Sequence, residues 1–375
     1  MYIAIHTGIV AQSPADSHWQ LISEAIIQLA ASQPAHRFLV IGTQKPGENG
    51  SGGNLQFKAL NPPPSLGPIG GWWYRKQVTK ALARQKCDLL LNFDAAWKGK
   101  LSIPHVMVLH PDWQSLSKEL LGEKKLSGTK LALLQQLQGL CVGFAGQAEK
   151  MAAATGIPME KIQVAGPASL PIFRPMVWVE KEAVKTSFSG GQEYFLYFGP
   201  AAPTGDMVVL LKAFSQFKKR QKCNMQLLIA LSKPDGHAAL HHKLASYKYR
   251  SDVRVMQEQT MTEIARLATA SYAVISPLKY QPGWWLLGSM QVGTAIAVVN
   301  TTIVQEVCGD ACINLTAWET DALAQNMMLL YKDENYRGQL VANAAKNIEN
   351  KNMNVAVAAL VRSIESAISH QQTPA

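Results

Sequence analysis

Short apolar segments alternate with amphipathic segments along the chain, and this alternation predicts strands and helices in turn. Apolar runs without a period of two are typical of parallel strands that helices cover on both faces. In the first half, the pattern predicts strands at residues 2–6, 37–42, 55–60, 88–93, 104–110 and 140–145. It predicts helices at residues 19–29, 73–86, 131–137 and 147–154.

The alternation stops at residues 166–193, which hold three prolines and two adjacent glycines and show no apolar period. Such composition is typical of an interdomain linker. A second alternation follows, with strands predicted at residues 194–199, 225–231, 253–256, 272–276, 295–300 and 312–315. Helices are predicted at residues 207–217, 236–248, 261–270, 284–291, 320–332, 334–348 and 354–369.

Two successive α/β units predict two Rossmann-like, doubly wound parallel-sheet domains that face each other across a cleft. Ligands of such folds bind outside the carboxyl ends of the strands. The expected boundaries are residues 1–168 for the first domain, 169–193 for the linker and 194–352 for the second domain. Residues 353–375 form a C-terminal helix and tail that could cross back to the first domain.

Composition is consistent with two ordinary domains. The chain has 375 residues, of which 47% are hydrophobic and 17% charged. No run of about 18 apolar residues predicts a membrane span, and the first residues are typical of a strand rather than a signal peptide. The five cysteines are scattered and odd in number, which favours reduced thiols and a cytoplasmic location.

The net charge of +10 favours anionic partners. The basic clusters are most simply solvated helix faces, and without a nucleic-acid-binding motif no nucleic-acid partner is expected. Trp72 and Trp73 precede Arg75 and Lys76. This combination is compatible with core packing or with peripheral contact to an anionic inner membrane surface.

Several segments resemble family 4 glycosyltransferases of the GT-B fold. Residues 194–217 and 271–315 are similar to the donor-side motifs, residues 157–175 to the linker motif, and His110-Pro111-Asp112 to a His-Asp pair after a strand. The resemblance implies hexosyl transfer, with retention, from a nucleotide sugar to a glycan or lipid-linked acceptor. It also implies that residues 1–168 form the acceptor-side domain and residues 194–352 the nucleotide-sugar-side domain. The nucleotide sugar would be a substrate, and no metal or other cofactor is implied.

The cations of the family's donor loop are missing here. The family places an Arg and a Lys beside the donor diphosphate, whereas this chain has Pro200 after Gly199 and Thr204-Gly205 in place of the Lys-Gly pair. A charge-assisted hydrogen bond is worth roughly 1.5–3 kcal/mol. Backbone N–H groups at the start of the next helix, expected near Asp206, could compensate in part, and we expect Asp206 to cap that helix.

The family's two glutamates are also absent. Their positions fall at Tyr280 or Gln281 and at Gly288 or Ser289. Two hypotheses therefore stay open, an active glycosyltransferase and a catalytically degenerate scaffold that acts as a glycan-binding or partner subunit. The neighbouring Trp284-Trp285 pair could stack on a base or sugar, or could close a site that no longer binds a donor.

Candidate site residues follow from the strand ends and the resemblance. His110 is the catalytic candidate and Gly8 the acceptor-binding candidate. A metal site is not expected, because the chain has no Asp-x-Asp triplet and the pair His237 and His241 has no Glu or Cys partner nearby. The donor-binding candidates are Gly199, Thr204, Gly205, Gln281, Ser289 and Thr294.

Overall fold

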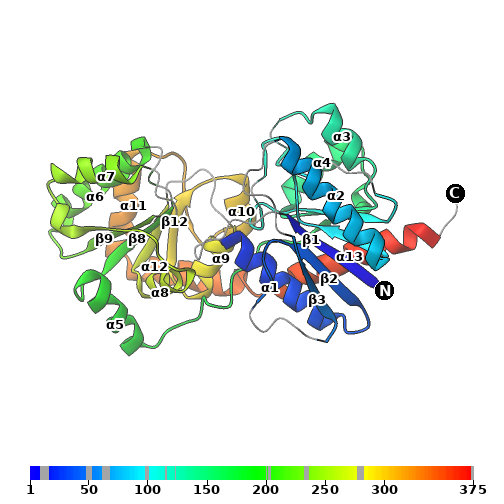
Figure 1. The fold of residues 1–375 in the computed structure, drawn as a ribbon. Coiled ribbons are helices and arrows are strands. Elements are labelled where there is room, and N and C mark those ends of the chain that lie inside the picture. The colour runs from blue at the N-terminus through cyan, green and yellow to red at the C-terminus, as the bar shows by residue number, and fades with distance from the viewer. Residues whose placement is uncertain are drawn as a thin grey trace. The chain divides into compact units, whose positions relative to one another are not determined.

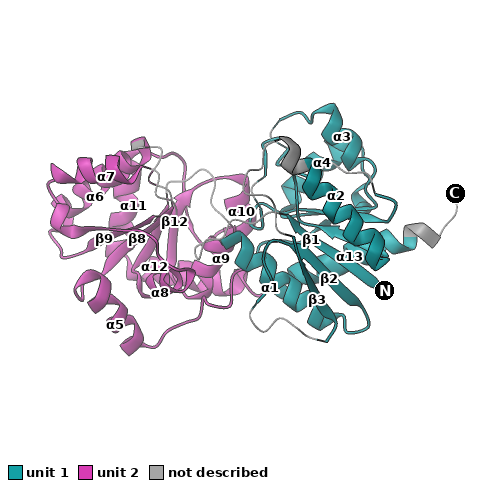
Figure 2. Ribbon diagram, viewed as in Figure 1, with its two compact units in different colours: residues 1–168, 352–375 teal, residues 169–351 magenta. Residues whose placement is uncertain are grey.

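The structure, a computed structural model, describes residues 1–8, 17–47, 53–60, 68–97, 101–114, 116–122, 124–199, 201, 204–231, 236–276 and 283–372. The chain divides into two compact units (Figure 2). Unit 1 comprises residues 1–168 and 352–375, and unit 2 comprises residues 169–351. Each unit is a parallel sheet with helices packed against it (Figure 1).

Unit 1 contains a seven-stranded parallel sheet of order β3-β2-β1-β4-β5-β6-β7. Five of its strands are almost wholly buried and carry mostly apolar residues on both faces, whereas the edge strands β3 and β7 are partly exposed. The strand order reverses between β1 and β4. The strands are β1 (Tyr2–Gly8), β2 (Arg37–Gly42), β3 (Leu55–Ala59), β4 (Leu89–Asn92), β5 (His105–Leu109), β6 (Gly139–Val142) and β7 (Ile162–Val164).

Five helices among the described residues cover this sheet. The last of them, α13, packs on α1 and on strands β5, β6 and β7, so the end of the chain does cross back to unit 1, where it is drawn in red (Figure 1). Its buried face includes Ala356, Leu360 and Ile364, which recur at helical spacing. The helices are α1 (Ser17–Ser32), α2 (Pro68–Gln85), α3 (Gly128–Leu134), α4 (Ala145–Thr155) and α13 (Met353–Gln372), with a 3₁₀ turn, η1, at Met159–Lys161.

Unit 2 contains a six-stranded parallel sheet of order β10-β9-β8-β11-β12-β13. The order reverses between β8 and β11. The strands are β8 (Tyr194–Gly199), β9 (Gln226–Leu231), β10 (Val253–Met256), β11 (Ala273–Ser276), β12 (Ala295–Val299) and β13 (Ile313–Leu315). The helices are α5 (Trp178–Ser189), α6 (Thr204–Gln221), α7 (His237–Ala245), α8 (Met261–Ala270), α9 (Gly283–Gln291), α10 (Thr302–Cys308), α11 (Thr320–Lys332) and α12 (Glu334–Asn347), with a 3₁₀ turn, η2, at Arg250–Asp252.

The expectation that residues 166–193 lack regular structure is wrong at α5. This helix packs on α8, but its apolar residues do not mark its buried face. Val177, Trp178 and Val179 are each at least 67% exposed, whereas the buried side includes Val184 and Lys185. The usual periodic signal of an amphipathic helix is therefore missing.

The fold class agrees with the prediction of two Rossmann-like parallel-sheet α/β units. Within the described part of the chain, no helix combines the length and the apolar character needed to cross a bilayer.

Candidate functional site

The switch point of the first sheet carries a buried chain of polar side chains. Asn92 Oδ1 accepts the backbone N–H of Asp94 (2.9 Å) and lies 2.9 Å from His6 Nδ1, so that nitrogen carries the proton. His6 Nε2 then accepts from the Tyr74 hydroxyl at 3.3 Å, and the Asn92 amide donates to His105 Nε2 at 3.1 Å. These contacts join the ends of β1 and β4 to β5.

His6 and His105, the two histidines of this hydrogen-bonded series, are both neutral near pH 7. Burial lowers the pKa of His6. Burial, and to a smaller extent repulsion from His6 when His6 is protonated, lowers the pKa of His105 to about 4. Sequence reasoning missed the chain. The available signal was a His or Asn within each of the otherwise mostly apolar segments YIAIHTG, LLLN and HVMVL.

Gly8, the acceptor-binding candidate, ends β1 beside a carboxylate. Its φ of +71° suits glycine, and a Cβ at this position would lie 3.2 Å from Asp94 Cβ. The preceding Thr7 is 4% exposed, and its hydroxyl has no hydrogen-bond partner among the described residues. Gly42 leaves room for that hydroxyl, because a Cβ there would lie 2.0 Å from Thr7 Oγ1.

His110, the catalytic candidate, is fully buried and has both ring nitrogens bonded. Its Nε2–H donates to Gly166 O at 2.8 Å, and its Nδ1 accepts the Asp112 backbone N–H at 3.1 Å. The ring stacks on Trp113 at 4.4 Å between centroids. Burial lowers the pKa of His110 to about 4 despite the hydrogen bond to Gly166. His110 is therefore a neutral imidazole that joins the end of β5 to the loop after β7.

In unit 2, helix α6 begins directly after the loop that follows β8. Gly199 ends β8 and is buried, Thr204 is the first helical residue, and Gly205 is exposed. Helix α6 starts at Thr204 and not near Asp206 as expected. Asp206 lies within the first turn of the helix and not at its cap position. The first turn presents backbone N–H groups to an anion, while the Asp206 carboxylate opposes one.

The Trp284-Trp285 pair is packed in the interior of unit 2. Trp285 lies 4.8 Å from Phe198 and 6.0 Å from Phe173 between ring centroids, and Trp284 lies 6.0 Å and 6.1 Å from the same rings. Both indoles are at most 1% exposed. We call these four residues the aromatic cluster. The geometry agrees with hydrophobic closure and leaves neither indole exposed for stacking on a base.

The cluster also fills the position at which the resemblance places the second glutamate. A Cβ on Gly288 would lie 2.8 Å from the Phe173 ring, so any larger side chain would displace that ring. The next residue, Ser289, donates its hydroxyl to Trp285 O at 2.9 Å.

The other donor candidates contribute little described geometry. The hydroxyl of Thr294 donates to Ala268 O at 2.8 Å, and the residue is buried. Gln281 lies outside the described residues, as does the side chain of Thr204. The structure thus brings Gly199, Thr204 and Gly205 together at one strand-to-helix connection, and the donor roles stay predictions.

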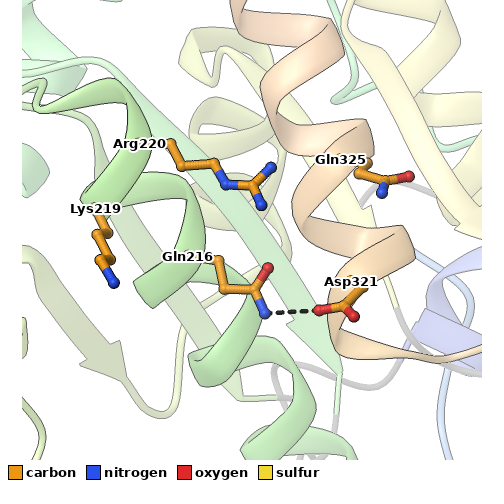
Figure 3. A pocket seen from close by; sticks show the side chains of 5 residues that line it. All are labelled: Gln216, Lys219, Arg220, Asp321 and Gln325. Carbon is orange, nitrogen blue, oxygen red and sulfur yellow. Dashed lines mark hydrogen bonds between the residues drawn. The ribbon is translucent and has the colours of Figure 1, made fainter.

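A polar pocket of about 480 Å³ lies between α6 and α11, far from that connection. Figure 3 shows Gln216 bonded to Asp321, at 2.7 Å, and Arg220 extending from α6 toward α11. Lys219 also lines the pocket, about 22 Å along α6 from its first residue at 1.5 Å per residue. This pocket is therefore separate from the predicted donor site.

Among the described residues, no group of three or more His, Cys, Asp or Glu side chains is placed to hold a metal ion. The rings of His237 and His241 are 4.2 Å apart on α7. Two imidazoles alone fall short of the three protein ligands of a typical zinc site.

Residues 179–347, most of unit 2, match the family model for group 1 glycosyl transferases. No curated protein matches the chain. Among solved structures, a glycosyltransferase from Rickettsia africae ESF-5 is 11% identical with a TM-score of 0.74, covering 100% of this chain and 99% of that one.

Two further structures show how widely the fold is used. HepE of Anabaena, in complex with UDP and glucose, is 13% identical with a TM-score of 0.72, covering 97% of this chain and 99% of that one. The UDP-GlcNAc 2-epimerase of Neisseria meningitidis, bound to UDP-GlcNAc, is 14% identical with a TM-score of 0.61, covering 97% and 100%. At these identities the likeness shows the fold alone.

Proposed function

We propose that the protein is a glycosyltransferase that moves a hexose from a nucleotide sugar to a glycan or lipid-linked acceptor, with retention at the anomeric carbon. The observation that carries the proposal is the match of residues 179–347 to group 1 glycosyl transferases on a fold of two Rossmann-like units. A UDP-GlcNAc 2-epimerase has a similar fold, so the fold alone does not determine which reaction is catalysed. HepE was solved with UDP-glucose, which favours a uridine nucleotide as donor.

In this proposal the donor diphosphate binds at the start of α6. Gly199 and Gly205 allow close approach of the backbone, and the N–H groups of the first helical turn stabilise the negative charge of the leaving diphosphate. No Arg or Lys lies between residues 199 and 206, so the helix end supplies the main stabilisation. Unit 1, around Gly8 and Asp94, would hold the acceptor, and His110 would keep its strand end in position.

Donor binding is tested by thermal unfolding with a panel of UDP-, GDP- and ADP-sugars. A donor present at 100 times its Kd stabilises the fold by about 2.7 kcal/mol. We expect a shift with a UDP-sugar, then slow donor hydrolysis, and NMR of the anomeric product should show retention. A flat response at millimolar concentrations would instead support the non-catalytic scaffold, and conversion to the 2-epimer would support an epimerase.

The place of the diphosphate is tested by Thr204→Asp. A negative charge in the first turn of α6 should weaken donor binding at least tenfold, because it opposes both the helix dipole and the N–H groups. Thr186→Asp is the matched control, since Thr186 is an exposed residue of α5. Equal donor affinity in the two variants would remove the α6 connection from the site.

A further inference from the structure

Unit 1 contains a pocket of about 210 Å³ at the carboxyl edge of its sheet. One wall is the segment Ala95, Ala96 and Trp97, which follows β4, and Met107 contributes from β5. The opposite wall comes from helix α3 and the chain before it. The residues of that wall are Leu120, Ser127, Thr129, Lys130, Leu133 and Leu134.

The pocket has an apolar floor and a polar rim. Trp97, Met107 and Leu134 are each at most 2% exposed, whereas Ser127 and Thr129 are exposed at the mouth. At the rim, the Lys130 ammonium pairs with Glu119 and donates to the Ser117 hydroxyl. A ligand that fits this arrangement carries an apolar group inward and polar groups outward.

The volume limits what the floor can hold. An apolar cavity of about 150 Å³ holds a benzene ring, so 210 Å³ accommodates one aromatic ring or a short alkyl chain. A long acyl or polyprenyl chain would extend well beyond the pocket.

The pocket adjoins the predicted acceptor position. The ring of Trp97 stands edge-on to His6 at 5.3 Å between centroids, and His6 belongs to the buried polar chain at the switch point. Asp94, which directly precedes the pocket wall, lies against Gly8. The segment from Asp94 to Trp97 therefore borders both Gly8 and the pocket.

We propose that this pocket binds an apolar group, of the size of one aromatic ring or a short alkyl chain, on the acceptor of the transfer reaction. The inference rests on the proposed function in naming the ligand an acceptor. Binding in the pocket itself requires neither donor nor turnover, so it is measured separately from transferase activity.

The test uses the full chain with ¹³C-labelled methionine methyl groups, titrated with methyl, butyl, hexyl and phenyl β-D-glucoside. Met107 lines the pocket and reports on its occupation, and its resonance is assigned with Met107→Leu. Met290, buried in unit 2, is the internal reference. Burying one CH₂ contributes about 0.8 kcal/mol, so we expect Kd to fall about fourfold per methylene from methyl to butyl glucoside.

A blocking variant supplies the second measurement. Thr129→Trp places an indole at the mouth from an exposed position, so it should weaken hexyl and phenyl glucoside binding at least tenfold without disturbing the floor. Thr79→Trp, at an exposed site on α2, is the matched control and should bind as the parent does.

Two results would overturn the pocket proposal: a Met107 signal that no glucoside moves at millimolar concentrations, or affinities that ignore chain length and the Thr129→Trp substitution. Failure of the donor panel alongside a saturable Met107 response would refute the transferase function and leave the pocket as a binding site.

Discussion

The two sheets end in different chemistry at their switch points. In unit 1 the buried side chains there are polar, and His6, Asn92 and His105 bond one another in series. In unit 2 the corresponding region is occupied by the aromatic cluster, with Phe198 next to Gly199 at the end of β8. At the switch point, directional hydrogen bonds thus join the strands of unit 1, whereas apolar packing fills the corresponding region of unit 2.

This difference determines which kind of ligand each unit can bind. A satisfied polar network fixes side chains in one arrangement, and its neutral histidines add no charge, so unit 1 suits an uncharged hydroxyl or sugar. Apolar packing stabilises unit 2 but supplies no counter-charge to a diphosphate. Under the proposed function, the backbone of the α6 connection is then the main positive feature of the donor site.

The largest expected effect comes from opening the aromatic cluster. Trp285→Ala should destabilise the protein by about 3–5 kcal/mol, the usual range for a buried Trp, measured by urea unfolding. Trp178→Ala is the control and should change stability by less than about 0.5 kcal/mol, because Trp178 is 73% exposed.

Trp285→Phe sharpens that result. The Trp285 Nε1–H is buried without a hydrogen-bond partner among the described residues, so Phe keeps the ring and removes an unsatisfied donor. It should therefore cost much less than Ala. Equal losses for Phe and Ala would show that the indole N–H, and not the ring packing, stabilises the cluster.

The next largest effect concerns how the stability of unit 1 depends on pH. His105 and His110 have folded-state pKa values of about 4, below the usual 6.5, so the unfolded chain binds more protons between these values. Stability is then full above pH 6.5 and is lost as pH falls toward 4. At pH 5 the loss should be on the order of 2 kcal/mol for each histidine.

The contribution of one histidine is separated by His110→Phe, which keeps an aromatic ring against Trp113 but removes the titrating group. Its unfolding free energy should fall less between pH 7.5 and pH 5 than that of the parent. Parallel profiles for the two proteins would mean that His110 is not the source of the acid sensitivity.

A smaller effect is expected at the contact between Gly288 and Phe173. Gly288→Ala should destabilise unit 2 by about 1–3 kcal/mol through overpacking, because the added methyl meets the ring at 2.8 Å. Phe173→Leu should relieve most of that loss in the double variant. In the control, Gly338→Ala on α12, nothing lies within 4 Å, so the helix should gain up to about 1 kcal/mol.

The positions of the strands along the chain could be anticipated because apolar runs mark buried parallel strands, and each predicted strand is present within a few residues. Helix α5 could not, since Val177, Trp178 and Val179 face solvent. Short β7, of three residues, also gives too brief a signal to separate from a loop.

The candidate site was less predictable because hydrogen-bond partners are set by the fold and not by spacing. His110 was singled out from its place after a strand, yet its two ring nitrogens are already bonded to Gly166 and Asp112, and burial keeps the ring neutral. Phe173 lies 115 positions before Gly288, so nothing local indicates that its ring excludes a side chain there. The His6, Asn92 and His105 chain likewise joins three strands.

The smallest effect is expected at Thr7, near the end of β1 in unit 1, whose buried hydroxyl has no hydrogen-bond partner among the described residues. Thr7→Val replaces a buried hydroxyl by a methyl of the same shape, which is close to neutral, or stabilising by up to about 1 kcal/mol, when the hydroxyl is unsatisfied. A loss above about 1 kcal/mol in urea unfolding would show that Thr7 Oγ1 has a partner in the folded protein. If stability is unchanged while glucoside binding weakens several-fold, the hydroxyl is kept for a ligand. Thr7→Ser retains the hydroxyl and should restore that binding, which places the acceptor at the polar edge of unit 1.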